Sequence, residues 1–376
     1  MMKFPSHVSI LLFCLTSYLL FFSFTQGASP YGRSSHRGGI ERVNNNKAKS
    51  KIFIVGSIGR FGRYVTEASI KAKHTTIGLV RAIPSANETE KINLIAQFKS
   101  WGVKIVYGDF NIDRKLIVKT MKKVDVVISC VGGSETPTQV NLTSAIVEAG
   151  NIKRFLPSEF AIDVDRLQDP VEPAKSMFAN KANIRRVVES LGIPHTYVVA
   201  NGFSARFWPN LAQVNPPVLL PYIKEVVAYG TGDSKATASY EADIATYTIK
   251  TIDDPLTLNK NLYISPPLNA LSYNELFSLW ETKSGNTLSK SYVSEEEMLQ
   301  MINDPTNTVN GLLAICYSVA IKNDYASYVI DPSFGYEASA LYPEVIYKSV
   351  GNYFDEVLAN ATLISSSNGA EGTFSI

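Results

Sequence analysis

The fold of this chain is indicated most clearly by residues 51–62, Lys51-Ile-Phe-Ile-Val55-Gly56-Ser-Ile-Gly59-Arg-Phe-Gly62. Its first five residues form a short apolar run that predicts a buried strand, and three glycines at intervals of three residues follow at once. The next residues, 63–73, carry a helical pattern. Strand, glycine turn and helix in this order are typical of the first unit of a dinucleotide-binding, doubly wound α/β sheet.

Each glycine of this turn answers a physical need. The first allows a tight turn, the second lets the backbone approach a pyrophosphate, and the third lets the helix pack closely on the strand. The helix amino terminus then attracts the anion. The alternative is a structural turn, because glycine patterns of this kind also arise by chance. The expected cofactor-binding residues here are Gly56, Ser57, Ile58, Gly59, Arg60, Phe61 and Gly62.

The end of the next predicted strand, 75–80, indicates which dinucleotide is bound. Arg81 follows it, at the place where an NAD-preferring site carries an acidic residue for the ribose hydroxyls. A guanidinium suits a 2′-phosphate instead, so NADPH is the expected cofactor. Arg60 and Lys91 are candidates for further cationic contacts, and solvated surface charge is an equal alternative for each of them.

Strands and helices continue to alternate to the fourth strand, 125–129, which predicts a parallel sheet with helices on both faces. The carboxyl end of that strand faces the cofactor crevice, so we expect Ser129 and Cys130 to lie against the dinucleotide. Cys130 is interpreted as a small residue at a strand end rather than a nucleophile, because no basic partner lies near it in the sequence.

The candidate for proton chemistry is Lys181, on a helix predicted over 173–191. The chain contains no Tyr-x-x-x-Lys motif, in which a phenol serves as the acid, and Met177 stands four residues before Lys181. A reductase of this fold would therefore need another acid or base, and Lys181 is the residue placed to supply it. The alternative is an ordinary lysine on a helix surface.

The order of these motifs resembles that of the plant isoflavone-reductase-like (NmrA-type) family. The resemblance rests on the glycine turn, Arg81, Leu156-Pro-Ser-Glu-Phe160, Lys181 with Ile184-Arg-Arg186, and Leu341-Tyr-Pro-Glu-Val345. It covers residues 50–357. The family contains NADPH-dependent pinoresinol-lariciresinol, isoflavone, phenylcoumaran benzylic ether and leucoanthocyanidin reductases, and eugenol synthases.

The resemblance implies a Rossmann-type, atypical short-chain reductase with a smaller carboxy-terminal substrate domain, and it places Lys181 at the general acid/base position. It also places Gln139, Phe160 and Asn201 near the nicotinamide and its ribose, and Arg185 beside the cofactor. The alternatives are a helix surface for Gln139, core packing for Phe160, a turn for Asn201 and a solvated charge for Arg185.

The expected function is reduction of a phenylpropanoid-derived aromatic, with hydride transfer to a benzylic, quinone-methide or enone carbon. The chain most resembles phenylcoumaran benzylic ether reductase and isoflavone reductase homologues. The alternatives are a pinoresinol-lariciresinol reductase, a eugenol synthase, or a regulator that senses NADP without catalysis.

Three departures from the family pattern bear on the substrate and cofactor. Ile58 replaces a threonine near the pyrophosphate, which could weaken cofactor binding. Ala161 and Ile162 stand where leucoanthocyanidin reductases carry a histidine, so that activity is disfavoured. Tyr317 replaces a histidine directed toward the substrate, and is expected either to contact substrate or to fill space.

The amino terminus predicts a signal peptide over 1–27, because an uncharged, mainly apolar run from Val8 to Phe24 follows Lys3. An uncleaved anchor and an error in the gene model are the alternatives. If the signal is used, the protein is expected in the secretory pathway or outside the cell; the alternative is the cytoplasm, as is usual for the family. A disordered basic linker is expected over 28–50, a cofactor domain over 51–203, a substrate domain over 204–358 and a disordered tail over 359–376.

Composition limits the remaining partners. Among 376 residues, Lys and Arg number 36 and Asp and Glu 34, a formal charge of +2 that argues against nucleic-acid binding. Three cysteines and four histidines form no metal-ligand spacing, so no metal is expected. The expected partner is a small aromatic phenylpropanoid, no stable membrane span is expected once the signal is cleaved, and a homodimer is left open.

Overall fold

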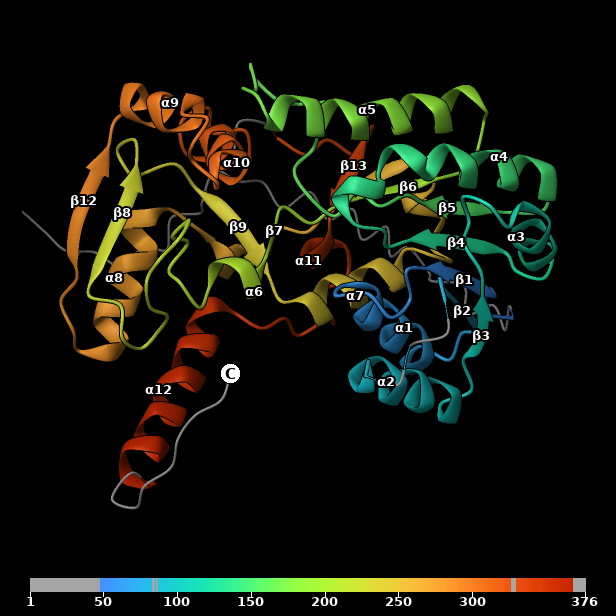
Figure 1. The fold of residues 1–376 in the computed structure, drawn as a ribbon, viewed down its shortest axis with the longest axis horizontal. Helices are drawn as coiled ribbons and strands as arrows, with labels where there is room; N and C mark the ends of the chain where they lie inside the picture. Colours follow the sequence, from blue (N-terminus) through green and yellow to red (C-terminus); the bar gives the residue numbers. More distant parts are fainter. Residues whose placement is uncertain (1–47, 83–84, 86, 326–328, 368–376) are drawn as a thin grey trace, which may run out of the picture. The chain divides into compact units, whose positions relative to one another are not determined.

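The computed structural model describes residues 48–82, 85, 87–325 and 329–367, which belong to a compact unit beginning at Ala48 (Figure 1). The predicted signal peptide and nearly all of the predicted linker lie outside these residues. The last residues assigned to that linker are part of the fold, because the Ser50 hydroxyl donates to Asp253 at 2.5 Å and Lys49 donates to the Ala72 carbonyl.

A parallel sheet forms the first half of the described chain, as the sequence predicts. Its order is β3-β2-β1-β4-β5, with every neighbouring pair parallel. The strands are β1 (Ile52–Val55), β2 (Thr76–Val80), β3 (Lys104–Tyr107), β4 (Val126–Ser129) and β5 (Arg154–Leu156).

Helices cover both faces of this sheet, because successive side chains of a strand point to opposite faces. Phe53 and Val55 of β1 pack in one core and Ile52 and Ile54 in another. Figure 1 shows the helices on either side. One layer contains α3 (Arg114–Met121), α4 (Val140–Ala149) and α5 (Ala174–Ser190); the other contains α1 (Gly62–Lys71), α2 (Thr89–Ser100) and α7 (Glu241–Lys250).

The sheet continues into strands that come from later in the sequence. A bridge between Phe155 and His195 brings β6 (Thr196–Val199) alongside β5. The parallel strand β10 (Lys260–Tyr263) then pairs with β6, and β13 (Gly335–Glu337) pairs with β10. Segments after residue 203 therefore return to extend the cofactor half of the molecule.

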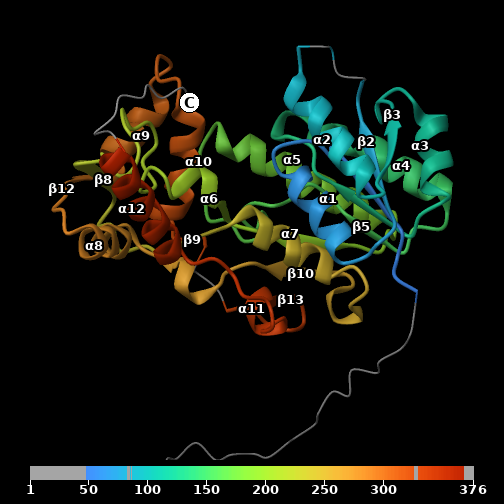
Figure 2. The same cartoon turned by 90° about the horizontal axis from the view of Figure 1, so that it is seen from below.

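Most of the remaining later chain packs around two further cores, an aromatic one that includes Trp208, Phe277, Trp280 and Phe354 and another that it shares with α5. Figure 2 shows its helices grouped together beside the first half. The elements of this part are β7 (Gly202–Phe203), α6 (Ser204–Phe207), β8 (Glu225–Tyr229), β9 (Ala236–Ser239), β11 (Ala270–Leu271), α8 (Tyr273–Ser284), β12 (Ser289–Val293), α9 (Glu295–Asn303), α10 (Asn310–Ala320) and α12 (Val350–Ser367). Helix α11 (Ala338–Leu341) packs instead on the core of the first half.

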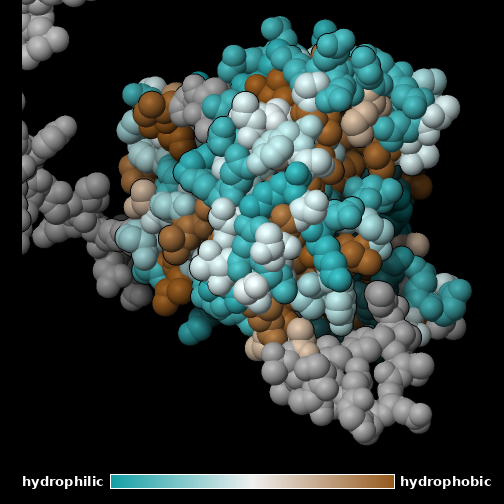
Figure 3. All heavy atoms as spheres, turned by 90° about the vertical axis from the view of Figure 1, so that its left-hand side faces the viewer, coloured by the Kyte–Doolittle hydropathy of each residue, from teal (hydrophilic) through white to brown (hydrophobic). Residues whose placement is uncertain are grey.

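Local chemistry fixes where α8 and α9 begin. Ser272 and Ser294 each accept a hydrogen bond from the backbone three residues later, and the glutamate at that position bonds back to the serine. These capping boxes satisfy amide groups that a helix start leaves unpaired. The face formed near β12 and these helices carries apolar side chains in small patches separated by polar ones (Figure 3).

The carboxyl terminus differs from the prediction of a disordered tail over 359–376. Helix α12 continues to Ser367, because Phe354, Val357 and Leu358 pack on the aromatic core and anchor the helix beyond Val350. Residues 368–376 lie outside the described part of the chain. Within that part, the helices are all too short or too polar to cross a bilayer.

Candidate cofactor cleft and lysine site

The glycine turn after β1 has no room for a side chain at Gly56 or at Gly62. Gly56 has a φ of +77°, a backbone conformation that L residues rarely adopt, and a Cβ there would lie 2.7 Å from the Cys130 carbonyl oxygen. A Cβ on Gly62 would lie 2.0 Å from the Gly56 carbonyl oxygen. The turn is therefore pressed against the end of β4 and the start of α1, the cradle that a dinucleotide pyrophosphate requires.

A cleft of about 450 Å³ opens beside this turn, within the range typical of small-molecule sites. Many of the residues expected from the sequence line it: Gly56, Ile58, Gly59, Arg81, Lys91 and Cys130. Burial raises the pKa of the Cys130 thiol, which agrees with a packing role rather than a nucleophilic one.

Acidic side chains in the same cleft face both of its cations. Arg81 Nε lies 3.4 Å from Asp109 Oδ2, and Arg81 Nη2 lies 3.5 Å from Glu135 Oε1. Lys91 donates to Glu88 and holds the pKa of that exposed carboxyl at about 2. The sequence reasoning did not find these carboxylates, since only the fold brings Glu135 opposite the end of β2.

Three other expected cofactor residues lie away from the cleft lining. Arg60 is exposed. Ser57 is buried and donates to the Leu79 carbonyl at 3.0 Å, so it joins the turn to β2. Ser129 is also buried, and its hydroxyl has no hydrogen-bond partner within the described residues.

Phe61 and Phe160 form an aromatic cluster with Phe203. The Phe61 ring centroid lies 4.6 Å from that of Phe160 and 5.2 Å from that of Phe203. Phe160 has a φ of +40°, a strained value for a bulky side chain. The cluster joins the glycine turn to the loop after β5.

Gln139 and Asn201 each brace a strand end. The Gln139 side-chain oxygen accepts from the Ser158 amide at 2.8 Å, just beyond β5. Asn201 follows β6 with a φ of +57°, and its amide donates to the Ile264 carbonyl at 3.3 Å. Both residues thus fix loops at the carboxyl edge of the sheet.

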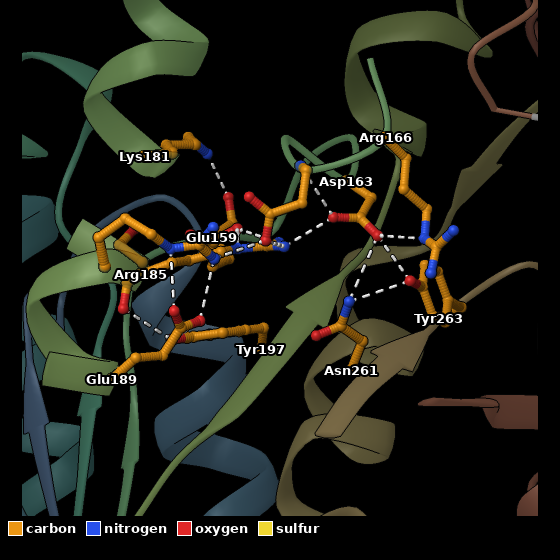
Figure 4. A network of polar contacts seen from close by, with 12 residues as sticks. Glu159, Asp163, Arg166, Lys181, Arg185, Glu189, Tyr197, Asn261 and Tyr263 are labelled. Atoms are coloured by element: carbon orange, nitrogen blue, oxygen red, sulfur yellow. Dashed lines mark hydrogen bonds and ion pairs between the residues drawn. The ribbon is translucent and has the colours of Figure 1, made fainter. Parts of the chain in front are cut away.

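Lys181 is half-buried on α5, and its ammonium donates to the backbone carbonyl of Glu159 (Figure 4). Burial lowers the pKa of Lys181, and the positive charge of Arg185 lowers it further, while the Glu159 carboxylate acts in the opposite direction. A lowered pKa favours the neutral amine, the form that can accept a proton, more than it is favoured in an exposed lysine.

Arg185, one helical turn from Lys181, is fully buried and does not line the cleft. Its guanidinium bonds to both Glu159 and Asp163, at 2.7 Å and 2.6 Å, and stacks on the Tyr197 ring at 4.6 Å from the centroid. Arg185 is therefore held in an internal ion-pair network (Figure 4), and its expected place beside the cofactor stays a prediction.

Tyr317 belongs to the buried core that α10 shares with Ala174 and Phe178 of α5. Its hydroxyl donates to Glu295 at 2.6 Å, which connects α10 to α9, and the side chain does not line the described cavities. The neighbouring Ile315 and Cys316 instead line a mainly apolar cavity of about 80 Å³, together with Trp208 and Tyr273.

A comparison with protein-family models identifies the fold's lineage: the NmrA-like family matches residues 48–354. The chain belongs to the NmrA-like family. This confirms the resemblance inferred from its motifs. The match spans the cofactor cleft, the lysine site and the aromatic core of the later chain.

Its relatives include plant reductases and synthases. An isoflavone reductase homolog of Nicotiana tabacum and a phenylcoumaran benzylic ether reductase of Populus trichocarpa are both 48% identical to the chain, over 308 and 307 residues. Eugenol synthase 1 of Petunia hybrida is 49% identical over 305 residues. The alignments cover 81–82% of this chain and 97–99% of each relative.

Solved structures give the same picture. The crystal structure of an isoflavone reductase superposes with a TM-score of 0.77 at 45% identity, covering 81% of this chain and 98% of that one. A binary complex of leucoanthocyanidin reductase with NADPH from Vitis vinifera gives a TM-score of 0.74 at 35% identity, covering 82% and 99%. The Rossmann-like α/β fold predicted from the sequence is confirmed.

Proposed function

We propose that this protein is an NADPH-dependent reductase of phenylpropanoid-derived aromatics, of the phenylcoumaran benzylic ether or isoflavone reductase type. Family membership and relatives at 48–49% identity support the reaction class. The related leucoanthocyanidin reductase that binds NADPH supports the cofactor. In this proposal residues 51–203 hold the cofactor, and residues 204–358 supply most of the substrate surface.

The glycine turn and the cleft beside it would hold the cofactor. Gly56, Gly59 and the amino terminus of α1 would face the pyrophosphate, and Arg81 would face the 2′-phosphate after leaving its acidic partners. When bound, NADPH supplies a hydride to a benzylic or enone carbon of the substrate. Ile58 lines the cleft, and its side chain offers the pyrophosphate no hydrogen bond.

Lys181 would act as the proton acceptor. Its neutral amine would take the proton of a para-hydroxyl group, and the electrons released into the ring would expel the benzylic ether oxygen. That oxygen leaves with the bonding pair and is later protonated, while the ring becomes a quinone methide whose benzylic carbon accepts hydride. With an enone substrate the protonated lysine would instead return a proton to the reduced product.

One chain of contacts carries this proposal. Lys181 donates to the Glu159 carbonyl, the next residue, Phe160, packs on Phe61, and Phe61 belongs to the glycine turn. The lysine with the lowered pKa is therefore held within one residue of an aromatic ring that touches the cofactor cradle. A surface lysine on α5 would have no such connection.

The test uses the full chain and the Lys181→Ala variant. NADPH and NADH are titrated by fluorescence, then dehydrodiconiferyl alcohol, pinoresinol, an isoflavone and coniferyl acetate are added while the reduced-nicotinamide absorbance is followed. We expect NADPH oxidation with one of these compounds, and its loss in Lys181→Ala with NADPH binding retained. Turnover that survives the substitution would remove Lys181 from the mechanism. Binding without turnover on any compound would favour an NADP sensor.

We also infer that residues 1–27 direct the chain into the secretory pathway, the cytoplasm being the alternative. The sequence contains the N-glycosylation sequons Asn87-Glu-Thr, Asn141-Leu-Thr and Asn360-Ala-Thr. Asn87 and Asn360 are exposed, so passage through the endoplasmic reticulum would allow glycans there. A mass decrease after endoglycosidase treatment of protein expressed in plant cells would support this inference.

The size of the same protein in solution would decide between a monomer and a homodimer.

A further inference from the structure

We propose that Glu159 and Arg185 are positioning residues for Lys181: the guanidinium fixes the Glu159 side chain, and Glu159 thereby presents its backbone carbonyl to the lysine ammonium. The inference rests on the proposed function, because it concerns the same lysine. It assigns Arg185 a role in the proton chemistry and none in cofactor binding.

The first contact lies between α5 and the loop after β5. Arg185 Nε and Nη2 donate to the same Glu159 oxygen at 3.2 Å and 2.7 Å. Both side chains are buried, with 0% of Arg185 and 2% of the Glu159 side chain exposed. A planar guanidinium bound in this way restricts the direction of the carboxylate as well as its distance.

The second contact holds the same loop farther along. Arg185 Nη1 donates to Asp163 at 2.6 Å, and the other oxygen of Asp163 accepts from the Tyr263 hydroxyl at 2.5 Å and from Asn261 at 3.3 Å. Asn261 and Tyr263 belong to β10. The loop after β5 is therefore clamped between a helix and a strand (Figure 4).

Lys181 bonds to the loop that these contacts hold in place. Its ammonium bonds to the carbonyl of Glu159, the residue whose side chain Arg185 holds. Lys181 and Arg185 are four residues apart on α5, so both face the same loop. A lysine that donates one N–H to a fixed carbonyl has the directions of its remaining donors, or of its lone pair when neutral, restricted.

Two charged groups act directly on Lys181, the Glu159 carboxylate and the Arg185 guanidinium. Burial lowers the pKa of the lysine most, the carboxylate raises it and the guanidinium lowers it, so the pair modifies the proton affinity as well as the position. Other titratable groups on α5 and on the helices packed against it, within the described residues, are Lys175, Arg186, Glu189, Glu148, Cys316 and Tyr317.

The test compares Glu159→Gln, Arg185→Lys and the control Arg186→Lys in the full chain. Arg186 is the adjacent residue, has 56% of its side chain exposed, and pairs with Asp165 and Glu189. Each variant is measured for NADPH affinity, for the pH profile of kcat/KM, and for the pH dependence of Lys181 acetylation without cofactor or substrate, read by mass spectrometry.

For Glu159→Gln we expect the acidic limb of the pH profile and the Lys181 labelling curve to move together to lower pH, because the lysine loses a carboxylate that favours its charged form. For Arg185→Lys we expect kcat to fall about tenfold or more, because an ammonium cannot hold both carboxylates as the guanidinium does. NADPH affinity should stay within about twofold in both variants, and Arg186→Lys should behave as the unmodified chain.

A large loss of NADPH affinity in Arg185→Lys would overturn the proposal and return Arg185 to the cofactor site. An unmoved labelling curve in Glu159→Gln would also overturn it, since the carboxylate would then not act on Lys181. Should Arg185→Lys fail to fold, Glu159→Gln and the labelling curve still decide. Retained turnover in Lys181→Ala would refute the proposed function alone, because labelling of Lys181 does not depend on catalysis.

Discussion

The cofactor cleft and the Lys181 network contain the same kinds of side chain in opposite surroundings. In the cleft, Arg81 has 62% of its side chain exposed and lies 3.4–3.5 Å from its acidic partners. In the network, Arg185 has 0% exposed and bonds at 2.6–2.7 Å. The first arrangement can exchange partners at little cost, whereas the second cannot.

This difference suits the two tasks. A site that must accept a charged ligand needs cations that can leave their internal partners, and exposed ion pairs are worth only about 0–1 kcal/mol. A group that must hold one geometry needs partners that cannot leave, and removing one member of a buried pair costs about 3–5 kcal/mol. Burial, rather than the number of ion pairs, separates a binding surface from a rigid support.

The largest expected effect follows from removing the buried cation Arg185. Arg185→Met should lower the free energy of unfolding by about 3–5 kcal/mol, because it removes the cation paired with buried Glu159 and leaves Asp163 with Arg166 alone. Arg81→Met should change stability by less than about 1 kcal/mol, since Arg81 is exposed and its carboxylates keep partial access to solvent. Urea unfolding of both variants measures the difference. Equal losses would contradict the contrast between the two regions.

A smaller effect concerns what the exposed cation binds. Arg81→Ala should weaken NADPH binding by about 1.5–3 kcal/mol, the usual worth of a charged hydrogen bond, and NADH binding far less. Fluorescence titration of both nucleotides provides the measurement. Arg114→Ala, on α3 and paired with Glu148, is the matched control. Equal losses for the two nucleotides would refute the assignment of Arg81 to the 2′-phosphate.

The smallest expected effect is a gain in NADPH affinity when the acidic partner Glu135 is neutralised. Glu135 competes with a 2′-phosphate for Arg81, so Glu135→Gln should tighten NADPH binding by about 0.2–1 kcal/mol and leave NADH unchanged. The gain should shrink as salt is added, because exposed charges are screened. Glu148→Gln, outside the cleft, should have no effect. Tighter binding of both nucleotides would mean that Glu135 acts through shape instead of charge.

The sequence predicted the parts of the fold that depend on local pattern. Buried strands and the glycine turn have short-range signatures, so β1 and α1 were predicted to within about two residues. Helix α2, over Thr89–Ser100, was not predicted: only Ile95 and Phe98 of it are buried, which is too little for a clear apolar stripe. The parallel sheet followed from the alternation of strands and helices.

The site was less accessible to sequence reasoning, because its ion pairs join distant segments. Arg81 and Glu135 meet only because β2 and the loop after β4 end at the same edge of the sheet. The sequence around Arg185 is the same whether the side chain faces a cofactor or the interior, and only the fold shows that it is buried. Tyr317 could equally face substrate or Glu295, and no pattern distinguishes those directions.

Strand β10 lies between β6 and β13, so hydrogen bonds of one sheet join strands from both halves of the chain. A chain cut after Phe203 would leave the outer edge of β6 unpaired, a surface that invites pairing with other chains. It would also remove Asn261 and Tyr263, which hold the loop beside Lys181. Fragment exchange between relatives should therefore move β6, β10 and β13 together. The two halves share a sheet and cannot be separated at the predicted domain boundary after residue 203.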